Sequence, residues 1–209
     1  TLMPTSAFVA NVECFLADAL IALGQPARAA PLLDDGDDQR LPSFLRAKRL
    51  LGRVRAARAA ARPAPELIER GLALAQGDAG LPVKMVLLLE QALLQAPEAA
   101  LALCDQVLAD AERTDAPLHR LLALARRIEP LLQGGDAAAA AAVAQRVQAD
   151  AAQLRGPGLY PPELQLLAGR ALAADARHDA ARAALTDALA WIDARVAGVP
   201  PGFRDSFLH

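Results

Sequence analysis

Helix-breaking residues recur about every 40 positions in this chain, and amphipathic segments fill the intervals between them. Each predicted pair of helices has a residue that can begin its second helix, and these are Pro26, Pro65, Pro97, Asp136 and Asp179. Successive spacings between them are 39, 32, 39 and 43 residues. Such a period is typical of stacked helix pairs, because one pair cannot bury its apolar face alone. We therefore expect an all-α solenoid of about five antiparallel helix pairs, with a plain helical bundle as the alternative.

The predicted repeat array occupies residues 1–198, and residues 199–209 form a C-terminal tail or cap. Within the array, the boundaries of the five units fall at helix breakers. The units cover roughly residues 5–38, 43–77, 82–113, 115–155 and 161–198.

Apolar side chains recur at steps of three and four within the predicted helices, which places them on one helical face. The first such face holds Phe8, Val12, Phe15, Ala19 and Ala22. A second, after Pro117, is a buried stripe of Leu118, Leu121, Ala125, Ile128 and Leu132. The last helix is expected to bury Ala181, Leu185, Ala188 and Ile192.

Alanine and leucine dominate the composition, with 51 Ala and 37 Leu among 209 residues, and only 3% of the residues are aromatic. These two residue types are among the best helix formers, whereas strand formers are scarce, so an all-β fold is excluded. The apolar content of 54% is too high for a disordered chain. Small residues at helix contacts allow close approach of the backbones, and leucine fills the remaining space.

The overall charge excludes some classes of partner. A net charge of −2 provides no field that would attract nucleic acid or an anionic membrane surface. No apolar run approaches the ~18 residues of a membrane-spanning helix, and no signal peptide is visible at Thr1–Ala10. The expectation is a cytoplasmic domain without direct nucleic-acid or membrane partners.

Motifs for catalysis, cofactors and metals are missing from the sequence. There is no phosphate-binding glycine loop, no dinucleotide fingerprint and no zinc-protease motif. Cys14 and Cys104 are far apart and are expected to be small buried hydrophobes. The acidic loop Asp34–Asp38 lacks the ligand spacing of a calcium-binding EF-hand, so it is interpreted as an exposed loop. We expect no enzyme activity, no cofactor and no bound metal.

The fifth unit carries a repeat-family pattern, which lies at Gly169, Leu172, Ala181, Leu185 and Ala188. The first unit has a similar pattern, at Leu16, Ala17, Leu20, Gly24, Ala29 and Leu33. At these spacings the chain resembles the tetratricopeptide repeats, although leucine and alanine replace most of the family's aromatic positions. The resemblance implies an array of helix pairs that presents a concave groove.

The end of the chain carries a second pattern, in which Trp191-Ile192 is followed by a linker and by Val199–Leu208. This segment resembles the closing part of helical-repeat regions in large bacterial signalling proteins, which are transcriptional activators or regulatory ATPases. The resemblance implies that the chain is the C-terminal sensor or scaffold part of such a protein.

The segment from Ser43 to Arg62 has seven basic residues and no acidic residue. Arg46, Arg49 and Arg53 share one flank of this predicted helix. If Gly52 occupies the small-residue position of the repeat, that flank faces the groove and binds the carboxylates of an acidic peptide. Two other interpretations remain. The arginines are solvated or pair with the Asp34–Asp38 loop, or they contact nucleic acid, for which stacking aromatics are missing.

The tail concentrates aromatic residues, because Phe203 and Phe207 are two of the five phenylalanines of the chain. Together with Leu208 they form a short apolar face. We expect this face to cover the end of the last repeat near Trp191. The alternative is a docking patch for another chain.

Taken together, these features predict a non-catalytic scaffold or sensor domain of a larger regulatory protein. It would bind a protein or peptide partner through the concave groove. The alternative function is self-association, in which exposed repeat ends or the tail pair with a second copy.

Overall fold

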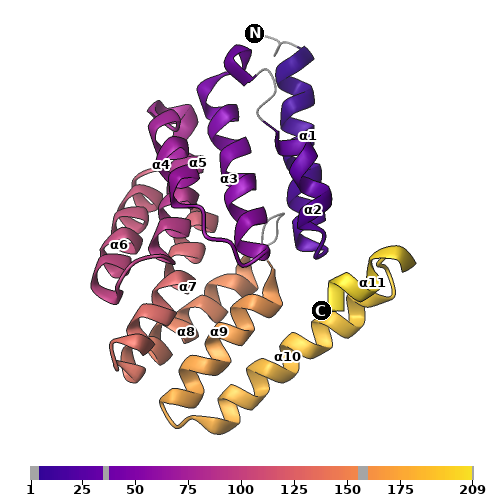
Figure 1. Cartoon of the computed structure of the whole chain (residues 1–209). Helices are drawn as coiled ribbons and strands as arrows, with labels where there is room; N and C mark the ends of the chain where they lie inside the picture. The colour runs from indigo at the N-terminus through magenta and orange to yellow at the C-terminus, as the bar shows by residue number, and fades with distance from the viewer. Residues whose placement is uncertain (1–4, 35–37, 155–159, 209) are drawn as a thin grey trace. The chain divides into compact units, whose positions relative to one another are not determined.

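The computed structural model describes residues 5–34, 38–154 and 160–208. All regular elements among these residues are helical (Figure 1), which confirms the predicted all-α class. In chain order they are α1 (Thr5–Ala22), α2 (Pro26–Ala29), η1 (Ala30–Leu33), η2 (Asp38–Arg40), α3 (Ser43–Ala59), α4 (Pro65–Leu74), α5 (Gly77–Ala92), α6 (Pro97–Arg113), α7 (Pro117–Gln133), α8 (Ala137–Gln153), α9 (Pro161–Ala174), α10 (His178–Val196) and α11 (Pro201–Leu208).

These helices form two compact units. The first contains residues 1–90 and 199–209, and the second contains residues 91–198. The C-terminal helix α11 therefore belongs to the same unit as α1, although about 180 residues separate them in the sequence.

In the first unit, α1 packs against α2, η1 and α3, and α3 packs in turn against α4. One core cluster lies between α1 and the following short helices and consists of Cys14, Ala17, Leu20, Ala29 and Leu33. A second cluster continues from α3 toward α5 and consists of Ala47, Leu51, Val54, Ile68, Ala75 and Leu87. Gly52 permits the approach of α3 to η1, because a Cβ atom there would lie 2.8 Å from Cδ2 of the buried Leu33.

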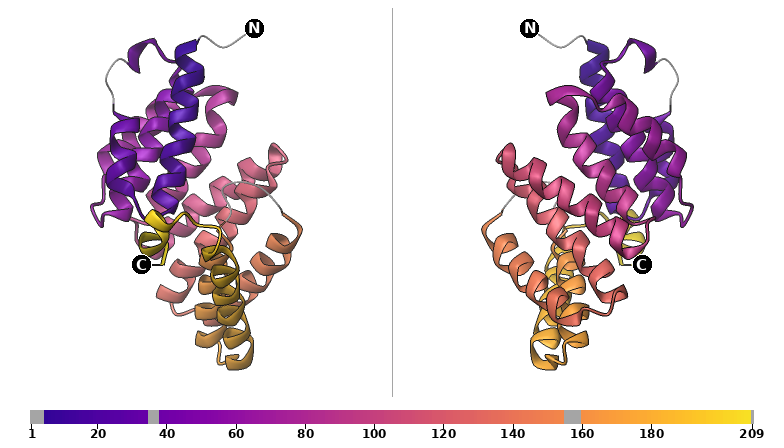
Figure 2. Two further views of the ribbon diagram at one scale, coloured as in Figure 1. Left: turned by 90° about the vertical axis from the view of Figure 1, so that its right-hand side faces the viewer. Right: turned by 90° about the vertical axis from the view of Figure 1, so that its left-hand side faces the viewer.

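In the second unit, each helix from α6 to α10 packs against the next one along the chain, and α7 also contacts α9. Figure 2 shows these consecutive helices from two sides. Their largest core cluster consists of Leu121, Ala125, Ile128, Ala140, Ala144, Val147, Leu164, Ala168 and Ala171. Five of these nine residues are alanine, which agrees with the close packing predicted from the composition.

Proline and aspartate begin several helices, as the predicted breakers require. Proline occupies the first turn of α2, α4, α6, α7 and α9, where its missing N–H costs no hydrogen bond. Asp136 caps α8, because its Oδ1 atom accepts a 2.9 Å hydrogen bond from the amide of Ala139. One predicted start is wrong: α5 begins at Gly77, five residues early, and includes Pro82.

The predicted stripe of α7 is confirmed at its centre. Leu121, Ala125 and Ile128 are buried, and Leu118 and Leu132 at the two ends are half-buried. Ala123 and Pro130, on the opposite side of α7, are buried as well, and Arg120 and Arg127 are half-buried.

The apolar face predicted for α1 points to solvent instead. Phe8, Val12 and Phe15 are all exposed, and so are Ala19 and Ala22. The core side of α1 holds smaller residues, which are Ala7, Ala10, Cys14 and Ala17, together with Leu20. Small side chains let α1 approach its neighbours closely, and that contact leaves the larger side chains on the opposite face.

The last repeat helix, α10, also departs from its predicted stripe. Ala181 and Ala188 are buried as expected, but Leu185 is 40% exposed and Ile192 is only half-buried. Leu185 lies at the edge of the contact with α9, where its side chain covers Gly169.

Candidate partner-binding surface

Helix α3 contains the predicted basic site, and it buries two separate arcs of its surface. One arc holds Leu45 and Gly52, and the other holds Ala47, Leu50, Leu51 and Val54. Basic side chains occupy the surface left between these arcs. Ala61, which was predicted to extend the apolar stripe, lies beyond the helix and is exposed, with a φ of 54°.

Arg49 is committed to the fold of the first unit. Its side chain is only 12% exposed, forms an ion pair with Glu13 of α1 and donates a 3.1 Å hydrogen bond to the carbonyl oxygen of Asp34. Charge-assisted bonds of this kind hold α3 against α1 and the chain that follows η1. The alternative in which this arginine pairs with the acidic loop is thus supported at Asp34, while residues 35–37 of that loop lie outside the described residues.

The other two predicted arginines lie on the same side of α3. Arg46 precedes Arg49 by one turn, and Arg53 follows it by one turn. Both are half-buried and retain exposed surface. The guanidinium groups of this flank therefore form a short basic row, of which the central one is occupied by Glu13.

The opposite flank of α3 is paired with acidic and polar groups of other helices. Lys48 donates a 2.8 Å hydrogen bond to Asn11 and lies 3.6 Å from the ring centroid of Phe15. Arg55 donates a 3.1 Å hydrogen bond to Asp18. The basic segment and the acids of α1 thus neutralise each other, a pairing that the sequence spacing did not reveal.

Glu90 of α5 also pairs with basic residues of α3. The carboxylate is 4% exposed and lies 3.0 Å from Nε of Arg58 and 3.9 Å from Nε of Arg55. A buried carboxylate needs such cations, because an isolated charge in the interior is strongly disfavoured. Arg58 therefore joins Arg55 in the packing of the first unit.

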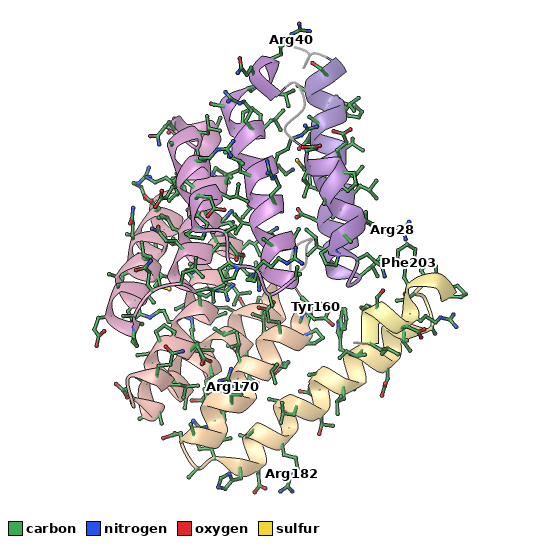
Figure 3. All side chains as sticks on the ribbon, in the orientation of Figure 1. Arg28, Arg40, Tyr160, Arg170, Arg182 and Phe203 are labelled. Carbon is green, nitrogen blue, oxygen red and sulfur yellow. The ribbon has the colours of Figure 1, made fainter. Side chains whose placement is uncertain are left out.

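The C-terminal helix α11 packs within the first unit, whereas Trp191 belongs to the second, so the expectation that the tail covers the last repeat near Trp191 stays a prediction. Phe203 packs against the cluster formed by α1, α2 and η1, and the Arg28 guanidinium lies 4.9 Å from its ring centroid. Figure 3 labels both residues. Phe207 is half-buried. Gly24 makes the docking possible, because a Cβ atom there would overlap the carbonyl oxygen of Ser206.

Trp191 has neighbours of its own within the second unit. Its ring stands edge-on to Tyr160 at a centroid distance of 5.5 Å, and the guanidinium of Arg195 lies 5.0 Å from the Trp191 ring centroid. The end of α10 is thus covered in part by Tyr160.

The outward face of α1, defined by Phe8, Val9, Val12, Phe15 and Leu16, is the surface that the sequence interpretation missed. All five side chains are exposed, with Phe8 at 60% and Phe15 at 57%. The only charged residues of α1 are Glu13 and Asp18, and both are paired with arginines of α3. The helix therefore presents a wide apolar strip to solvent, with the Lys48 ammonium group over the Phe15 ring. A signal for it was visible: α1 has apolar residues on nearly all sides, so periodicity could not identify the buried one.

The two cysteines lack the environment of a reactive thiol. Cys14 and Cys104 are buried and free, and burial raises the pKa of each thiol to about 11. At neutral pH both thiols are protonated, whereas the thiolate is the nucleophile and the metal ligand. Over the described part of the chain, no group of three or more His, Cys, Asp or Glu residues could hold a metal ion. None of the described helices is long and apolar enough to cross a membrane.

The fold has a counterpart among solved structures, although no protein-family model matches the chain and no curated protein matches it. A crystal structure from Podosopora anserina, of a protein assigned to the kinesin light chains with nearly identical TPR-like repeats, superposes with a TM-score of 0.54. The alignment has 23% sequence identity and covers 86% of this chain and 93% of that chain. At this identity the likeness concerns the fold alone. Together with the consecutive helix packing, it confirms that the chain has an all-α fold of the tetratricopeptide-like helical-repeat type.

Proposed function

We propose that this chain is a non-catalytic scaffold domain that binds another polypeptide through the basic row Arg46, Arg49 and Arg53. Helical-repeat folds of this kind generally mediate contacts between proteins. The observation that carries the proposal is the composition of α3, which has no acidic residue and keeps this row on one side of the helix. Guanidinium groups suit the carboxylates of an acidic peptide, because each can form two parallel hydrogen bonds.

Within this proposal the three arginines have different tasks. Arg49 orients the surface through Glu13, and Arg46 and Arg53 on either side of it contact the partner. An acidic segment laid along α3 would meet both outer guanidinium groups, which are two helical turns apart.

Charge reversal of the two outer arginines tests this function. The probe is a fluorescein-labelled poly-glutamate peptide, and binding is measured by fluorescence anisotropy at low and high salt. We expect R46E/R53E to weaken binding at least about tenfold, and we expect salt to weaken binding by the wild type. The matched control is R177E/R182E, which reverses two exposed arginines of the second unit. Equal losses in both variants, or no binding by the wild type, would contradict the proposal.

The wider context is a second part of the proposal. The segment Val199–Leu208 supports an origin in a bacterial transcriptional activator or regulatory ATPase, in which residues 1–198 act as a cytoplasmic five-unit repeat array. Sequencing the region of the gene upstream of the codon for Thr1 tests this context. A nucleotide-binding or DNA-binding module there is the expected result, and an unrelated type of domain would contradict it.

Self-association is the second candidate function, and the outward face of α1 favours it. Exposed apolar strips of this width are uncommon on monomeric proteins and often mark contact sites. The tail residues Phe203 and Phe207, which were the other candidates for such a contact, are partly covered within the first unit.

A further inference from the structure

We infer that two copies of this chain associate through the outward face of α1, with the two α1 helices antiparallel about a twofold axis. The inference rests on the second candidate function, self-association, and names the surface and geometry that would carry it. It does not depend on the proposed binding of acidic peptides by α3.

The spacing of the exposed residues is that of a helix–helix seam. Phe8, Val12, Phe15, Ala19 and Ala22 follow one another at steps of four, three, four and three, and all of them are exposed. This is the a/d pattern of a heptad, in which two helices cross at a shallow angle along their whole length. The pattern extends over four turns of α1, so the occupant it fits is another helix.

The order of side-chain sizes along the seam selects an antiparallel second copy. A twofold axis between Val12 and Phe15 places Phe8 opposite Ala19 of the second copy, and Val12 opposite its Phe15. Each layer then combines a large side chain with a smaller one, as close packing requires. A parallel arrangement would instead place Phe8 against Phe8 and Ala19 against Ala19, which leaves a gap at the alanine layer.

The charges of the first unit permit this contact. Glu13 and Asp18 lie on the flanks of α1 and are neutralised by Arg49 and Arg55. Lys48 lies over Phe15 near the middle of the seam. The two Lys48 ammonium groups would therefore approach each other across the axis, and salt would screen their repulsion. Association should strengthen with salt, whereas binding of an acidic peptide should weaken.

The available area indicates a weak dimer. The exposed parts of Phe8, Val9, Val12, Phe15 and Leu16 amount to roughly 400 Å² per copy, when a phenylalanine side chain offers about 200 Å² and an aliphatic one about 100 Å². Stable interfaces bury about 800 Å² per partner. The expected dissociation constant therefore lies between about 10 μM and about 1 mM.

Sedimentation equilibrium of the 209-residue chain tests the inference. Between about 5 μM and about 500 μM the weight-average mass should rise toward twice the monomer mass. F8E/F15E should remain monomeric, with association weakened at least about 100-fold. The control L166E/L189E places the same charges on exposed leucines of the second unit and should associate like the wild type. Circular dichroism verifies that both variants fold.

The possible results distinguish the proposed surface on α1 from self-association itself. A wild type that stays monomeric at the highest concentration overturns both self-association and this inference. The remaining occupant of the outward face of α1 would then be a helix of another protein. A dimer that persists in F8E/F15E overturns the surface only. In either case the poly-glutamate experiment is unaffected, because the substituted residues lie outside α3.

Disulfide trapping tests the antiparallel geometry independently. When the F8C and A19C proteins are mixed and oxidised, the mixed disulfide should exceed both homodisulfides. The native Cys14 and Cys104 compete little, because both are buried and their thiols have a pKa of about 11. Preferential F8C homodisulfides would overturn the antiparallel arrangement.

Discussion

Helices α1 and α7 have similar lengths, 18 and 17 residues, but they bury side chains of different size. Helix α7 buries large side chains such as Leu121 and Ile128, and its Arg120 and Arg127 are half-buried. Helix α1 buries small side chains such as Ala10 and Ala17. Its Phe8, Phe15 and Leu16 side chains remain exposed, and Leu20 is buried. The comparison shows that hydrophobicity alone does not determine which face of a helix is buried, because close approach to neighbours can favour small residues.

The largest effect on the free energy of unfolding is expected when a large side chain is removed from each helix. We expect L121A to lower the free energy of unfolding by about 2–5 kcal/mol, because Leu121 is fully buried and a cavity would remain. F8A should change it by less than about 0.5 kcal/mol, because the Phe8 side chain is mostly exposed. Urea denaturation at low micromolar protein concentration measures both without interference from association. A comparable loss in F8A would show that the outward face of α1 is covered in solution.

An intermediate effect is expected when a small residue of α1 is enlarged. Ala17 is fully buried against the first cluster, so A17L should overpack it and cost about 1–3 kcal/mol of unfolding free energy. Ala19 lies two residues away on the exposed face, so A19L should be neutral within about 0.5 kcal/mol. Thermal unfolding of the pair provides the comparison, and equal melting temperatures would contradict the assignment of faces.

The smallest effect concerns the polar flank between α1 and α3. R49A should cost about 1–2 kcal/mol of unfolding free energy, because it removes the hydrogen bonds that Arg49 donates to Glu13 and to the Asp34 carbonyl oxygen. R46A, one turn away, should change stability by less than about 0.5 kcal/mol. Denaturant titration distinguishes them. If R46A is the more destabilising substitution, the division between an orienting and a partner-binding arginine is wrong.

Much of the fold was predictable from local signals, and α7 illustrates why. Its charged residues leave a single apolar stripe, and Pro117 at its first turn marks its start. Helix α1 carries two apolar stripes, and choosing between them requires the shape of α3, which no local pattern contains. Pro82 misled the prediction for α5, because a proline in the first turns of a helix and one at its start look alike in sequence.

The candidate site was predicted less well, since its pairings join distant segments. The basic row on α3 followed from helical spacing, but the Glu13–Arg49 contact spans 36 residues. The docking of Phe203 on α1 and α2 spans still more. The helical pattern near Trp191 offered a local partner for the tail, and the long-range contact through Gly24 could not be read from spacing.

The placement of α11 has a consequence for the order in which the chain assembles. Residues 91–198 are synthesised between the two parts of the first unit, so the first unit is complete only after the last helix of the chain has been added. Closing the long intervening loop costs only a few kcal/mol, because the entropic cost grows with the logarithm of loop length. Deleting the last ten residues would therefore destabilise the first unit, most of which is synthesised before the second.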